Sequence, residues 1–65
     1  MTGPADASAL GRRYALIDLA VNAEIAADAA REALARTPPG DDRDYLAARV
    51  ATLADTAAKL RSAAR

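Results

Sequence analysis

The sequence predicts an all-α protein, an antiparallel two-helix hairpin that dimerises into a four-helix bundle. First, apolar residues recur at helical spacings of three and four on both sides of a single break. Second, the break contains Thr37-Pro38-Pro39-Gly40, through which a continuous helix is impossible. Third, the helix before the break has more apolar sides than one neighbouring helix covers.

The composition indicates too little core material for a chain that stands alone. Domains of about this size bury little apolar surface without a further stabilising device, and this chain has 65 residues. Although 52% of the residues are hydrophobic, 20 are Ala and none is Phe or Trp. The absence of Cys excludes disulfides, and the absence of His argues against a zinc site. We therefore expect a single domain that associates with another chain.

The charges argue against two classes of partner. Nine basic and nine acidic residues cancel, so the field that draws a protein to nucleic acid or to an anionic membrane is missing. No apolar run approaches the roughly 20 residues of a membrane span, and Met1 is not followed by a signal-like apolar segment. The sequence predicts a cytoplasmic protein whose partners are proteins.

The first residues precede the strong helical pattern. Residues 1–8 are expected to form an N-terminal arm or an irregular helix start, with Thr2, Asp6 and Ser8 as candidate caps. Residues 9–65 are expected to form the hairpin, with a helix over about 9–36, a turn at 37–41 and a helix over about 42–64. Gly11 weakens the helix before Arg12.

The first helix carries two apolar faces. One face points to the second helix. The other, which we call the outer stripe, has spacings of four, three, four and four and is expected to point away from that helix. The outer stripe consists of Leu10, Tyr14, Ile17, Val21 and Ile25. Five large apolar groups on one line predict an interface with another chain.

The turn stops one helix and starts the next. Pro38 disfavours helical angles at Thr37, so the first helix ends near Arg36. Gly40 tolerates unusual backbone angles, and either Asp41 or Asp42 is expected to cap the second helix. A connection this short places the helices antiparallel.

The second helix has one apolar line, which meets the inner face of the first helix in a seam. Folding the chain about Gly40 pairs positions whose numbers add to roughly 80, so Ala23 meets Ala57, and Ala20 or Leu19 meets Leu60. We expect the Ala23 layer to be the closest approach of the helices. The seam comprises Leu16, Leu19, Ala23, Ala27, Ala30, Leu34, Leu46, Val50, Leu53, Ala57 and Leu60.

Few residues suit catalysis or metal binding. Without His or Cys, no nucleophile has a plausible general base beside it. Glu24, Asp28 and Glu32 lie on one helical edge, and a solvated face with Glu32 paired to Arg36 explains them better than a metal site. We therefore expect no catalytic residue, no metal and no cofactor, and predict that the protein is not an enzyme.

Two polar groupings remain open. Arg12 and Arg13 are predicted to lie at the same end of the hairpin as Arg61 and Arg65, where an anion could bind. Separately, Asp18 and Asn22 lie between the two apolar faces, either as polar groups that fix the interface register or as its exposed rim.

The function predicted from these observations is a non-enzymatic protein interaction or assembly module. It is expected to form a homodimer through the outer stripe. The alternative is a small accessory or regulatory subunit that binds a different protein, such as an enzyme or a toxin, through the same stripe.

Overall fold

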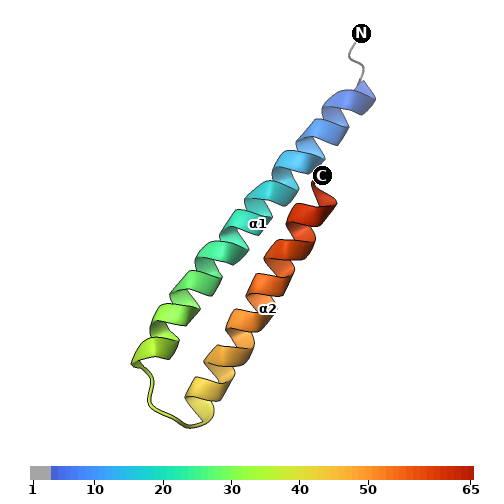
Figure 1. The fold of residues 1–65 in the computed structure, drawn as a ribbon. Helices are drawn as coiled ribbons and strands as arrows, with labels where there is room; N and C mark the ends of the chain where they lie inside the picture. Colours follow the sequence, from blue (N-terminus) through green and yellow to red (C-terminus); the bar gives the residue numbers. More distant parts are fainter. Residues whose placement is uncertain (1–3) are drawn as a thin grey trace.

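The protein is a hairpin of two α-helices, shown in Figure 1. The computed structural model describes the backbone of residues 4–65 and the side chains of residues 8–65. Helix α1 spans Pro4–Arg36 and helix α2 spans Asp41–Ala63, and they pack antiparallel side by side. The molecule is a thin rod with extents of 58 × 14 × 12 Å. The predicted all-α antiparallel hairpin is confirmed.

Helix α1 starts earlier than the sequence pattern suggested. It begins at Pro4, whereas the pattern placed the helix start near residue 9. Proline suits a first helical turn because its missing amide hydrogen has no partner there, and the alanines that follow favour helix. The helix continues through Gly11. The part of the N-terminal arm at residues 1–3, with Thr2, lies outside the described residues.

The connection between the helices is short and closed by hydrogen bonds from both sides. The Thr37 hydroxyl donates to the Ala33 carbonyl at 2.6 Å, and the Thr37 amide donates to the Leu34 carbonyl at 3.2 Å. The Arg43 guanidinium then donates to the Thr37 carbonyl at 3.0 Å. Since these bonds satisfy carbonyls at the end of α1, the helix ends cleanly before the prolines.

The start of α2 corrects the predicted cap. Gly40, with φ of 151°, is the N-cap residue, and no side chain donates or accepts a capping hydrogen bond there. The prediction that Asp41 or Asp42 is the cap was wrong, because Gly40 reaches a backbone conformation that L side chains rarely adopt and α2 starts directly after it. Asp41, Asp42 and Asp44 lie in the first turn, where negative charge complements the helix dipole.

The core of the hairpin consists of alanine. Every buried residue among the described side chains is Ala. The large apolar residues of the seam are only half-buried, and no large described side chain is fully buried. The buried residues are Ala20, Ala23, Ala27, Ala30, Ala57 and Ala64, and the half-buried ones are Leu16, Leu34, Leu46, Val50, Leu53 and Leu60. A core of methyl groups lets the helices approach closely but removes little apolar surface from water.

Leu19 does not lie in the seam. Its side chain is 54% exposed, whereas Ala20 is completely buried. The sequence had left both residues as candidates to meet Leu60. Because consecutive helical residues are 100° apart, placing Ala20 between the helices turns Leu19 onto the flank of α1.

Helix α1 extends past the end of α2. The two helices have 33 and 23 residues, and the Arg13 Nε donates to the Ala64 carbonyl at 3.0 Å where α2 ends. The α1 turns before Arg13 therefore project beyond α2, as the blue end of the ribbon shows in Figure 1. Leu10 lies on this overhang.

Candidate interaction surface

The outer stripe is largely open to solvent. Leu10, Tyr14 and Ile25 are 51%, 62% and 61% exposed, and Val21 is also exposed. All four lie on α1 within its first two thirds. The two described helices form a rod too thin to contain a second layer over these residues, so the hairpin presents a line of large apolar side chains to water.

Ile17 differs from the rest of the stripe. It is half-buried and lines a small hollow near the end of α2, together with Arg13, Arg61, Ala64 and Arg65. The prediction that it points away from α2 was therefore wrong. Ile17 lies at the edge of the stripe nearest α2, where the Arg side chains partly cover it.

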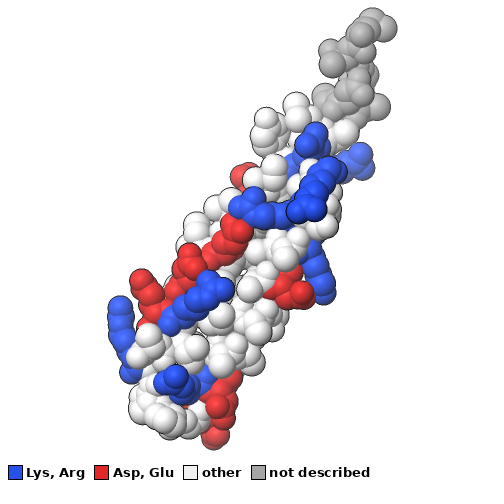
Figure 2. Space-filling model, in the orientation of Figure 1, with Lys and Arg blue, Asp and Glu red and all other residues white. Residues whose placement is uncertain are grey.

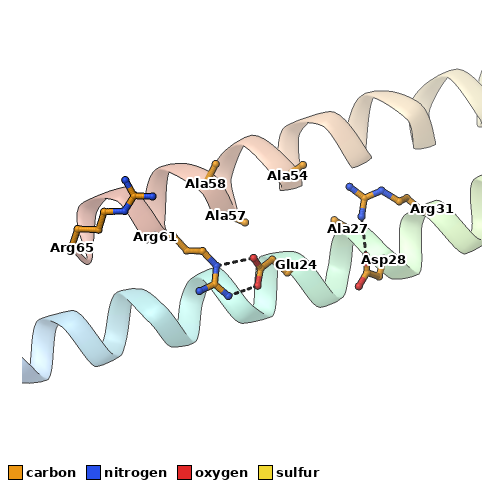
Figure 3. A pocket seen from close by; sticks show the side chains of 9 residues that line it. All are labelled: Glu24, Ala27, Asp28, Arg31, Ala54, Ala57, Ala58, Arg61 and Arg65. Carbon is orange, nitrogen blue, oxygen red and sulfur yellow. Dashed lines mark hydrogen bonds and ion pairs between the residues drawn. The ribbon is translucent and has the colours of Figure 1, made fainter.

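A shallow groove runs between the helices on the same flank. Arg61 and Arg65 line both this groove and the hollow around Ile17, so the stripe and the groove share one side of the hairpin. Figure 3 shows the groove with alanines at its floor and charged groups along its edges. It is lined by Glu24, Ala27, Asp28, Arg31, Ala54, Ala57, Ala58, Arg61 and Arg65. In Figure 2, basic and acidic side chains are interspersed along the visible face.

A bidentate ion pair crosses the groove. Arg61 Nε and Nη2 donate to the two carboxylate oxygens of Glu24, at 2.8 and 2.6 Å (Figure 3). These hydrogen bonds lower the pKa of Glu24 below its ordinary value, with the positive charge of Arg61 adding to the effect. The pair joins residues 37 positions apart and so fixes the register of α1 against α2.

The ion pair makes hairpin stability depend on pH. The pKa of Glu24 is lower in the folded chain than in the unfolded chain, so ionised Glu24 stabilises the fold. This stabilisation is fully present above the pKa of the unfolded chain, and it is lost as pH falls through the pKa of the folded chain. When pH is lowered from about 7 to about 3, the melting temperature of Glu24→Gln should therefore fall less than that of the wild type. Circular dichroism melts of both proteins measure the difference. Glu32→Gln, on the exposed edge of α1, is the control and should follow the wild type.

The comparisons add no relative. No family model, curated protein or solved structure matches this chain significantly.

The row of carboxylates on α1 is divided between ion pairs. Glu24 bonds to Arg61, and Asp28 bonds to Arg31 at 2.8 Å within the same helix. The predicted pair of Glu32 with Arg36 is not among the ion pairs of the described residues, so that prediction was wrong. The described residues contain no group of three or more potential ligands that would hold a metal ion.

The basic residues near the end of α2 do come together. Arg13, Arg61 and Arg65 line the hollow around Ile17, but Arg13 and Arg61 already donate to Ala64 and Glu24. Arg12 is exposed on α1, as are Asp18 and Asn22. The hydrogen bonds made by Arg13 and Arg61 leave less donor capacity for an anion than the sequence suggested.

Sequence reasoning missed the Glu24–Arg61 pair. Its positions add to 85, so the two residues lie more than one helical turn away from the register in which facing positions add to roughly 80, and only their long side chains bring the charges together. Tyr45, near the start of α2, is a further exposed aromatic residue, with 63% of its surface accessible. Neither described helix is long and apolar enough to cross a bilayer.

Proposed function

We propose that this protein is a non-enzymatic interaction module that self-associates through the outer stripe, forming a dimeric four-helix bundle from two hairpins. The observation that carries the proposal is the contrast between an interior made of alanine and large apolar side chains left exposed on one line. Covering that line with a second hairpin supplies the core that the single hairpin lacks.

The surface area of the chain supports association. Its accessible area is 4870 Å². A compact monomer of the same mass, 6.7 kDa, exposes about 3,900 Å², so the hairpin exposes roughly 1,000 Å² more than expected. A stable dimer of standard size removes about 800 Å² from each partner. The excess reflects the rod shape and is comparable to the area that such an interface covers on one partner.

The flank beside the stripe is suited to close packing. Ala54 and Ala58 of α2 line the groove next to α1, so a second hairpin meets small side chains there instead of bulky ones. The Glu24–Arg61 pair crosses this groove and places charged groups beside the stripe, and polar groups at the margin are typical of protein interfaces. An apolar line with alanines beside it and charges at its margin is the arrangement expected of a docking face.

Sedimentation equilibrium of the wild-type chain tests the proposal. Between micromolar and hundreds of micromolar concentration, we expect a reversible transition from the 6.7 kDa chain to a species of twice that mass, with dimer predominant at tens of micromolar. Circular dichroism at the same concentrations should show helicity rising with association. A fully helical monomer throughout the range would contradict self-association and favour the alternative, in which the stripe binds a different protein.

A further inference from the structure

We infer that the two copies associate antiparallel, around a two-fold axis that crosses α1 between residues 17 and 18. This inference rests on the self-association proposed above and adds the orientation and the paired residues. Leu10 of one copy then packs against Ile25 of the second copy, and Tyr14 packs against Val21 of the second copy. Ile17 lies beside the axis.

The spacing of the stripe fits this symmetry. The pair Leu10 and Ile25 and the pair Tyr14 and Val21 are centred on the same point, so reversing one helix superposes these four apolar positions on one another, while Ile17 falls opposite Asp18. The axis places Ile17, the half-buried member, where the two copies meet. An isologous contact of this kind closes on itself and stops at two copies.

The antiparallel orientation places the overhang of α1 against a continuing helix of the second copy. Leu10 projects past the end of α2, which reaches Arg13. In an antiparallel pair, each overhang lies along the continuing α1 of the second copy, near its exposed Ile25. In a parallel pair the two overhangs pair with each other, and Ile25 of each copy faces Ile25 of the second copy.

The charges on α1 favour the same choice. The line of the stripe continues at helical spacing into Asp28 and Glu32, both exposed. A parallel pair brings these carboxylates against the same carboxylates of the second copy, which repel. An antiparallel pair separates the two rows by about 30 Å, at 1.5 Å per residue, and sets Asp28 opposite residue 7 of the second copy. That position is in the first turn of the second copy's α1, where the helix dipole attracts negative charge and the adjacent Asp6 opposes this attraction.

One contact of the antiparallel pair is unfavourable. Asp18 of each copy comes near Asp18 of the other at the rim beside the axis. Asp18 is exposed, so water and salt screen this repulsion. The repulsion between the two solvated Asp18 carboxylates destabilises the antiparallel dimer less than the repulsion between the rows of Asp28 and Glu32 destabilises a parallel one.

Disulfide trapping tests the orientation, since the chain contains no Cys. Leu10→Cys, labelled with nitrogen-15, and Ile25→Cys, unlabelled, are mixed in a glutathione redox buffer and analysed by mass spectrometry. We expect the mixed disulfide between positions 10 and 25 to exceed each homodisulfide at least tenfold. In an antiparallel pair the two copies of position 10 lie about 22 Å apart, beyond the reach of a disulfide.

The outcomes separate the orientation from the association itself. Predominant homodisulfides, or the one-to-two-to-one ratio of random pairing, overturn the antiparallel pair while leaving the dimer intact. Ile17→Cys, beside the axis, reports dimer formation in either orientation, so its failure to crosslink together with a monomeric wild type overturns both proposals.

Discussion

Ile25→Asp is expected to convert the dimer into a monomer over the concentrations at which the wild type associates. Ile25 is among the most exposed large apolar residues and lies on the outer stripe. A carboxylate there would have to give up water on association without gaining a partner. We expect the dissociation constant to rise at least thirtyfold, corresponding to about 2 kcal/mol or more. Sedimentation equilibrium measures it directly.

Leu19→Asp is the matched control for this variant. Leu19 is 54% exposed, lies on the same helix and is aliphatic, but is on the opposite flank from the stripe. The two variants therefore have the same net charge and nearly the same loss of hydrophobicity and helix propensity. Leu19→Asp should change the dissociation constant less than threefold. Equal weakening by both variants would mean that the outer stripe is not the interface.

Ala57→Leu is expected to have the largest effect on the hairpin itself. Ala57 is 3% exposed and lies in the all-alanine interior, so three extra carbon atoms force the helices apart. Overpacking of this kind costs about 1 to 3 kcal/mol, and chains of this size have only about 3 to 5 kcal/mol from their core. The melting temperature should fall by about 4 to 8 °C for each kcal/mol lost.

Ala48→Leu shows whether the loss comes from packing. Ala48 is on the same helix and exposed, so Leu there adds the same carbon atoms without entering the seam. Its melting temperature should stay close to that of the wild type at equal protein concentration, which must be fixed because association shifts the midpoint. A similar fall in both variants would show that α1 and α2 do not approach most closely at Ala57.

Much of the fold could be predicted because local rules decide it. Pro38 and Pro39 end a helix whatever surrounds them, and the spacing of apolar residues identifies the facing sides. The predictions that were wrong concern geometry that the sequence pattern does not determine. The choice of Ala20 over Leu19 for the interior requires a helix rotation of only one residue, and helical periodicity does not distinguish neighbours that finely.

The candidate site was predicted less completely than the fold. The outer stripe follows from periodicity alone, and its exposure agrees except at Ile17, which Arg61 and Arg65 partly cover. Long flexible side chains that cover a neighbour are not visible in a helical pattern. The predicted cap of α2 was wrong for a related reason. The N-cap is Gly40, whose backbone angles start the helix, and the acidic side chains that follow make no capping hydrogen bond.

The alanine interior also affects how heat unfolds the isolated hairpin. Unfolding raises the heat capacity mainly by hydrating newly exposed apolar surface, and methyl groups supply little of it. The curve of free energy against temperature is therefore shallow, and the unfolding enthalpy is small. Such a chain melts over a wide span of temperature, and a sharper calorimetric peak appears only when larger side chains become enclosed between copies.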